Sequence, residues 1–248
     1  MKWQADGYIV SVRPHGETSA IINVLTKDQG RHAGLVRGGR SRRMRPVLQP
    51  GNQVNVAWNA RLSEHLGTFT VEALDARAAI LMQDRMSLAA LNAVCALSMQ
   101  ALPEREPHPK LYDVFEILLA QLDDSDVWPA IYVRFEIGLL QALGYGLDLS
   151  ECAATGTKDN LTHVSPRSGR AVCAGAAEPY LDKLLPLPAF LQGQNSLQDG
   201  DIADGLALSE YFLKTRIFHN QNKDMPEARA RMVEMLGREL RKDLRNPN

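Results

Sequence analysis

The pattern of hydrophobic residues changes near residue 75, and this change constrains the fold more than any other feature of the chain. Before it, short segments rich in β-branched and aromatic residues alternate with polar or Gly/Pro-containing segments, a pattern typical of strands. After it, Ala, Leu and Met recur at helical spacing. The sequence therefore predicts an α+β protein, with a β domain over 1–75 and a mainly α-helical domain over 76–248.

Strand-like segments occupy residues 8–12, 20–26, 32–36, 53–58 and 68–74. In the fourth, Val54, Val56 and Trp58 alternate with Gln53, Asn55 and Ala57, so one side of that strand is expected to face a core. Five short strands in a segment of about 75 residues favour a small closed barrel, and a five-stranded OB-type barrel is the natural candidate. An SH3-like barrel of two packed sheets would give almost the same pattern.

The second part of the chain has several helical stretches. They are expected over 77–102, which ends before Pro103, and over 109–122, 128–144, 201–219 and 226–243. Residues 145–180 hold many Gly, Ser and Thr residues and are expected to be irregular.

Six arginines lie within fifteen residues with no acid among them, and all but the first lie between the third and fourth predicted strands: Arg31, Arg37, Arg40, Arg42, Arg43 and Arg45. The planar guanidinium suits phosphate because it donates two hydrogen bonds at once. The Gly38–Gly39 pair predicts a mobile loop that can follow a flexible polyanion. A basic surface that tracks a nucleic-acid backbone is therefore favoured over a merely solvated loop.

The charge is divided unevenly along the chain. Residues 1–80 hold 11 Lys and Arg against 6 Asp and Glu, although the whole chain has a formal net charge of -1. The first part therefore attracts polyanions, while the acidic remainder favours solubility. Aromatic residues make up only 6% of the chain, and Trp3, Tyr8, Trp58 and Phe69 are better explained as core residues than as platforms for bases.

Three stretches resemble the bacterial RecO family of recombination mediators in the family's order: "GETSAIINVLTKDQGRHAGLVRGGRSRR" (16–43), "RFEIGLLQALGYGLDLSECAATG" (134–156) and "HVSPRSGRAVC" (163–173). The resemblance runs from about residue 3 to residue 240. It implies an OB domain followed by a helical domain, and no bond-making or bond-breaking activity. It also implies binding of single- and double-stranded DNA, annealing of complementary strands, and action with RecR to load RecA onto DNA covered by the single-strand-binding protein SSB.

Some members of that family carry a zinc site made of two Cys-x-x-Cys pairs in the irregular segment. Here Cys152 is followed by Thr155 at the partner position, and Cys173 by Ala176. Two thiolates, even with His163 between them, fall short of a tetrahedral site, so we expect no zinc and a degenerate zinc-finger-like insertion at about 145–180. Cys95 lies among Ala, Leu and Met and is expected to be a core residue.

Arg134 interrupts the apolar stretch "YVRFEIGLL". A buried charge needs a partner, and Glu136 or another acid is the simplest one. The family resemblance implies another role, because a basic residue at this position binds the acidic, hydrophobic C-terminal tail of SSB. Arg134 would then hold a tail carboxylate, with Phe135 and Leu139 lining a pocket for the terminal aromatic residue.

Two rival functions remain open from the sequence. One is an RNA- or ribosome-associated OB protein, and the other is a hydrolase whose acids meet only in three dimensions. Asp123, Asp124 and Asp126 cluster, but they lie just before a predicted helix, where acids cap free amides. The absence of a long apolar run or a secretion signal, and an odd number of distant cysteines, favour a cytoplasmic, nucleoid-associated protein with no membrane partner.

Overall fold

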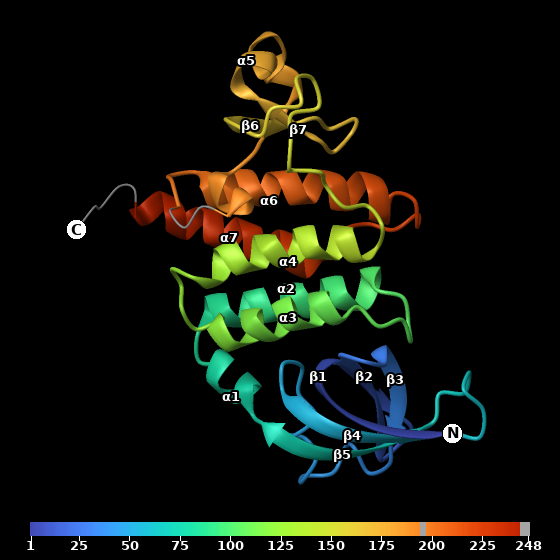
Figure 1. Ribbon diagram of the computed structural model, residues 1–248. Coiled ribbons are helices and arrows are strands. Elements are labelled where there is room, and N and C mark those ends of the chain that lie inside the picture. The colour runs from blue at the N-terminus through green and yellow to red at the C-terminus, as the bar shows by residue number, and fades with distance from the viewer. Residues whose placement is uncertain (194–196, 244–248) are drawn as a thin grey trace. The chain divides into compact units, whose positions relative to one another are not determined.

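The computed structural model describes residues 1–193 and 197–243; the last residues of the predicted helical domain, 244–248, lie outside the described residues (Figure 1). The chain forms two compact units. One contains Met1–Asp123 together with the C-terminal segment from Pro226, and the other contains Asp124–Met225. The predicted boundary after residue 75 marks the change from strands to helices, whereas the compact unit extends further because three helices and the C-terminal helix pack with the barrel.

The first unit begins with a closed five-stranded barrel in the order β1-β2-β3-β5-β4. The OB-type barrel is therefore confirmed, and β3 and β5 meet in parallel through the pair Leu35 and Thr68. The strands are β1 (Lys2–His15), β2 (Ser19–Thr26), β3 (Gly30–Val36), β4 (Gln53–Asn59) and β5 (Thr68–Asp75). Strand β1 is much longer than the predicted 8–12, because its first half pairs with β4 and its second half with β2.

Alternating side chains fill the barrel. Val54, Val56 and Trp58 are buried and their neighbours on β4 are not, which confirms the predicted alternation. Gly34 has a specific packing role, because a Cβ there would lie 2.3 Å from the ring of Phe69. The buried core consists of Ile9, Ala20, Ile22, Val24, Val36, Leu48, Val54, Val56, Trp58 and Phe69.

A helical layer packs on the barrel within the same unit. It contains α1 (Arg77–Leu81), α2 (Arg85–Ala101), α3 (Pro109–Gln121) and α7 (Glu227–Asp243), which packs along α2. The single helix predicted over 77–102 is wrong, because Asp84 starts a new helix by accepting a hydrogen bond from the Ser87 amide at 2.6 Å. Tyr8 of β1 packs on Tyr112 and Phe115 of α3, and its hydroxyl donates a hydrogen bond to the Glu116 carboxylate at 3.2 Å.

The second unit contains a helical pair and a small antiparallel sheet of order β7-β6-β8; we call residues 145–192, which include this sheet, the ribbon. The helices are α4 (Trp128–Ala142) and α6 (Asp201–Phe212), which continues as the π-helix η3 (Leu213–Phe218). Glu136 of α4 is fully buried and accepts a hydrogen bond from the Ser209 hydroxyl of α6 at 2.6 Å. The ribbon has β6 (Leu161–Val164), β7 (Ala171–Cys173), α5 (Ala174–Ala177), η1 (Glu178–Lys183), β8 (Leu185–Pro186) and η2 (Ala189–Gln192). The segment expected to be irregular thus carries two short strands.

His32 is buried inside the barrel and meets the rings of Trp3 and Trp58 edge-on, with centroid distances of 5.0 and 4.8 Å. Burial lowers the pKa of His32, although a hydrogen bond to the Ala33 carbonyl partly opposes this. The folded state therefore favours neutral His32. In the unfolded chain, His32 binds a proton near the ordinary pKa of about 6.5.

We expect the free energy of unfolding to fall as the pH drops below about 6.5, because the unfolded state takes up a proton that the folded state resists. Chemical denaturation at about pH 7.5 and 5.5 measures this loss, which should be smaller in His32→Gln. An NMR titration that places the pKa of His32 above its ordinary value would contradict the interpretation.

Candidate nucleic-acid interface

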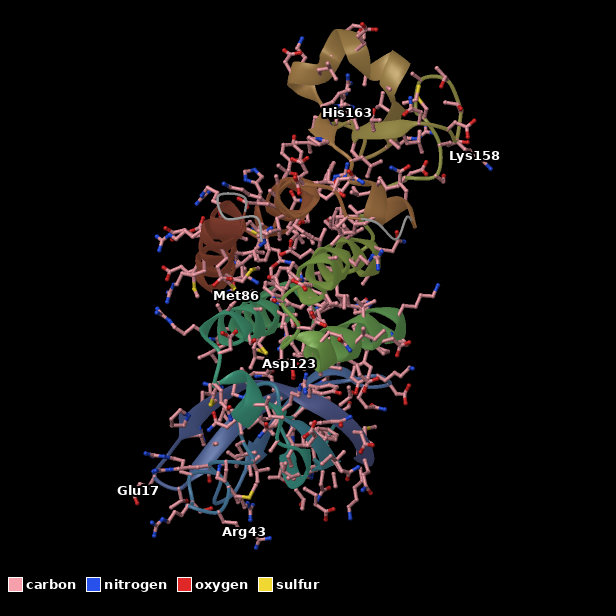
Figure 2. The ribbon with its side chains drawn as sticks, turned by 90° about the vertical axis from the view of Figure 1, so that its left-hand side faces the viewer. Glu17, Arg43, Met86, Asp123, Lys158 and His163 are labelled. Atoms are coloured by element: carbon pink, nitrogen blue, oxygen red, sulfur yellow. The ribbon has the colours of Figure 1, made fainter. Side chains whose placement is uncertain are left out.

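The arginine-rich segment connects β3 to β4 and lies against the turn between β1 and β2. The Arg40 amide donates to the Thr18 carbonyl at 2.9 Å, and the Arg40 guanidinium donates to the Gly16 carbonyl at 2.9 Å. Figure 2 shows Arg43 and Glu17 at the end of the barrel remote from Asp123. We call residues 37–50 the arginine loop.

The backbone of the arginine loop is more ordered than the Gly38–Gly39 pair predicts. The Arg45 amide donates to the Ser41 carbonyl at 3.1 Å and the Leu48 amide to the Met44 carbonyl at 2.8 Å. Leu48 is buried in the barrel core, and Met44 packs against that core. The loop therefore has an apolar anchor, and the freedom that remains belongs to its arginine side chains.

Five of the six predicted arginines project from this anchored loop: Arg37, Arg40, Arg42, Arg43 and Arg45 are all exposed. In the part of the chain that the structure describes, no carboxylate forms an ion pair with any of them. The Arg40 guanidinium uses one donor on the Gly16 carbonyl and keeps others free, so a phosphate can replace water on these arginines without breaking an ion pair in the described structure.

Arg31 has a different position from the other five. It is half-buried on β3, where its Nε donates to the Leu102 carbonyl at 3.1 Å and its Nη1 to the Asn23 amide oxygen at 2.9 Å. Burial lowers the pKa of Arg31, against the opposing influence of Glu104. This guanidinium joins the barrel to the end of α2, so the structure does not group it with the arginine loop.

The edge of β3 is covered by the segment that follows α2. The Arg105 amide donates to the Arg31 carbonyl at 2.8 Å, and the Ala33 amide donates to the Glu104 carboxylate at 3.4 Å. OB barrels commonly bind oligonucleotides across strands 2 and 3. Here the protein's own chain occupies part of that face, which leaves the arginine loop and the neighbouring β1–β2 turn as the exposed basic surface.

The aromatic residues of the barrel are largely occupied with one another. The side chains of Tyr8, Trp58 and Phe69 are buried, which confirms that they are core residues. Trp3 stacks on Trp58 with ring centroids 5.9 Å apart and lines a shallow cavity of about 490 Å³ with Lys2 and Thr68. The rings of Tyr8, Trp58 and Phe69 are therefore not exposed as platforms for bases.

Sequence reasoning missed two groups that the fold places beside functional elements. Arg13 and His15 are exposed at the end of β1, next to the turn that contacts Arg40. Only the strand register could have revealed them. Arg105 has a positive φ of 67° and donates to the carbonyls of Ser63 and His65, so it holds the loop between β4 and β5 in place.

The insertion keeps two cysteines close together. The Cys173 amide donates to Cys152 Sγ at 3.3 Å, and the Thr155 hydroxyl lies 3.6 Å from Cys173 Sγ. Burial raises the pKa of Cys152, but hydrogen bonds from the Thr155 hydroxyl and from backbone amides outweigh this effect and lower it to about 6. Among the described residues, no group of three His, Cys, Asp or Glu side chains could hold a metal ion.

The proposed tail-binding residues on α4 separate into two environments. Arg134 is exposed, donates to the Phe190 carbonyl at 3.0 Å and lies over the Phe190 ring at 5.8 Å. The side chains of Phe135 and Leu139 are fully buried in the helical core. They therefore do not line an open pocket, and Arg134 is the one of the three that a partner can reach.

The acids before α4 do not converge on one point. Asp123 pairs with Arg77 at 2.5 Å, while Asp124 accepts a hydrogen bond from the Asp126 amide at 3.1 Å. The predicted capping by these acids is wrong, because α4 has Val127 as its N-cap and no side chain caps its amides. Asp124 instead closes a turn before the helix, and Asp123 forms an ion pair. No helix in the described part of the chain is long and apolar enough to span a bilayer.

The closed barrel and its unpaired arginines define an OB-barrel protein with a surface suited to polyanions. The chain matches the family models Recombination protein O N terminal over residues 1–77 and Recombination protein O C terminal over residues 82–226. It belongs to the RecO family.

Similar relatives named DNA repair protein RecO come from several bacteria. The one from Rhodospirillum centenum is 52% identical over 236 residues, with 94% of each chain covered. The one from Ruegeria sp. is 48% identical, with 97% of this chain and 100% of the relative covered. The one from Cereibacter sphaeroides (strain ATCC 17023) is 49% identical over 96% of this chain and 100% of the relative.

The two environments of arginine predict effects of very different size on the free energy of unfolding. Arg31→Ala leaves two buried acceptors without a donor and should lower the free energy of unfolding by about 1–3 kcal/mol. Arg43→Ala removes an exposed side chain and should change it by no more than about 0.5 kcal/mol. Urea unfolding of the two variants checks this, and equal losses would contradict the assignment.

Proposed function

We propose that this protein acts in DNA repair and recombination by binding DNA phosphates on the arginine loop. The observation that carries the proposal is the set of five exposed arginines without carboxylate partners on an anchored loop. Membership of a family whose relatives are named DNA repair proteins supports DNA as the polyanion. Arg13 and His15 extend the same surface along the β1–β2 turn.

We propose that both single- and double-stranded DNA bind there and that complementary strands are annealed. Two strands repel each other through their phosphates, and a basic surface that binds both lowers this repulsion and raises their local concentration. Base pairing then supplies the specificity, so the protein need not read bases. This role requires neither a cofactor nor bond cleavage, and we propose that the protein is not an enzyme.

We expect Arg40→Ala/Arg42→Ala/Arg43→Ala to weaken binding of labelled single-stranded DNA and to make the log–log salt slope shallower by about 2, from about 0.7 per phosphate contact. Fluorescence anisotropy across a salt series measures both quantities. An unchanged slope in a folded variant would contradict the proposal.

The matched control removes the same charge from α7 through Arg231→Ala/Arg238→Ala/Arg241→Ala. Arg231 and Arg238 are exposed and paired with Glu227 and Glu234, respectively. Equal losses in both triple variants would indicate a general charge effect and not a site. An RNA strand of the same sequence that competes better than DNA would favour the alternative, an RNA- or ribosome-associated protein.

The partners implied by the family are also proposals: RecR, the SSB tail and, indirectly, RecA. Exposed Arg134 supports the SSB tail, because its guanidinium has donors beyond the one used by Phe190. The tail carboxylates would bind these donors, while the terminal aromatic residue would need an apolar surface other than buried Phe135 and Leu139.

We expect Arg134→Glu to weaken binding of a synthetic SSB-tail peptide roughly tenfold or more, because a hydrogen bond to a charged group contributes about 1.5–3 kcal/mol. Isothermal titration calorimetry measures this, with Arg167→Glu on the ribbon as the matched control. Equal effects of the two variants would remove Arg134 from the site.

We also propose that the insertion holds no zinc. Two of the four family cysteine positions remain, Cys152 and Cys173, and the Thr155 hydroxyl stands beside Cys173 where a third thiolate would be needed. Hydrogen bonds to the two sulfur atoms would then connect the segments that zinc connects in some other members of the family.

A further inference from the structure

The ribbon of the second unit brings Cys152 and Cys173 together from two different segments. Cys152 follows the turn after α4, and Cys173 ends strand β7. Figure 2 marks this ribbon by Lys158 and His163. The Cys173 amide points at Cys152 Sγ from 3.3 Å, and the Thr155 hydroxyl contacts Cys173 Sγ at 3.6 Å. Both thiols are free.

The backbones that carry the two thiols lie side by side. The Ala153 amide donates to the Ala171 carbonyl at 2.8 Å, a bond of the kind that joins neighbouring strands about 5 Å apart. A disulfide requires Cα atoms within about 7 Å of each other. The Cys152 amide also donates to the Thr157 carbonyl at 2.7 Å, which fixes the turn around this cysteine.

The two thiols differ in exposure, and both differ from the third cysteine. Cys173 is half-buried, so a small oxidant can reach it, whereas Cys152 is only 1% exposed. Cys95 is buried on α2 in the other unit, and burial raises its pKa to about 12, which makes it unreactive. The chain therefore has one thiol pair and one inert thiol.

We propose that Cys152 and Cys173 form a reversible dithiol–disulfide site that hydroperoxides oxidise. The site is independent of the arginine loop and of DNA binding. In the insertion, a disulfide would join the segments that a metal ion joins in a zinc finger. This bond would link the turn after α4 directly to β7.

The chemistry proceeds in two balanced steps. The Cys173 thiolate attacks one oxygen of the hydroperoxide, the O–O bond breaks, and the departing oxygen leaves as water or alcohol with the thiol proton; Cys173 becomes a sulfenic acid. The Cys152 thiolate then attacks the sulfenic sulfur, the S–S bond forms and the S–O bond breaks; the departing hydroxide takes a proton from solvent and leaves as water. Two electrons pass from the two thiols to the peroxide, and a dithiol reductant reverses the change.

The test treats the reduced full-length protein with one equivalent of hydrogen peroxide and measures free thiols, intact mass and linked peptides. We expect two thiols to disappear, the mass to fall by two hydrogen atoms, and one peptide pair to join residues 152 and 173. Dithiothreitol should restore the starting mass. Differential alkylation of wild-type protein gives this answer without any variant.

Three cysteine variants test which thiols form the bridge. Cys152→Ser and Cys173→Ser should each abolish the mass loss, while Cys95→Ala, the matched control, should leave it unchanged. Addition of oxygen atoms without mass loss, disulfide-linked dimers, or a bridge that includes Cys95 would each overturn the proposal. Unchanged thiols after peroxide treatment would overturn it as well.

Discussion

The barrel depends on β1, the long strand whose two halves pair with different neighbours. The first half of β1 pairs with β4 and its second half with β2, while β3 and β5 meet through a single parallel pair. Without β1 the sheet would present open edges, and its apolar interior would be exposed to water. Closure also decides where each connection lies, so it brings the start of the arginine loop beside the β1–β2 turn.

The interior of the barrel explains why the basic surface is built on a loop. Trp58, Phe69 and His32 contact one another inside, and Gly34 leaves the room that the Phe69 ring needs. These aromatic residues therefore stabilise the barrel and are not free to bind bases. The arginine loop is anchored by Leu48, which keeps its backbone in place while the guanidiniums project into water. An anchored backbone that carries exposed arginine side chains suits a ligand whose phosphates repeat regularly but whose nucleobases vary.

The ribbon of the second unit is held together by hydrogen bonds to sulfur and by ion pairs. Cys152 Sγ still accepts the Cys173 amide, and Thr155 contacts the second sulfur through its hydroxyl. Arg170 adds ion pairs to Asp148 at 3.2 Å and Glu151 at 3.0 Å, which hold the turn after α4 to the rest of the ribbon. Several contacts from different segments thus fix the position of the two cysteines.

The sequence by itself determined the class of fold, because hydrophobic periodicity and the breaks between segments are local properties of the chain. It also determined that arginines gather between β3 and β4 and that Cys152 and Cys173 lack two partners. Only the tertiary structure decided which arginines are exposed and which one is held by hydrogen bonds within the protein. Arg31 belongs to the same run as Arg43, yet strand pairing directs it towards Leu102 and Asn23. Leu102 is distant in the sequence, and Asn23 lies on another strand, β2. The burial of Phe135 and Leu139 and the contact of the β1–β2 turn with Arg40 likewise depend on long-range packing, which no local pattern of residues encodes.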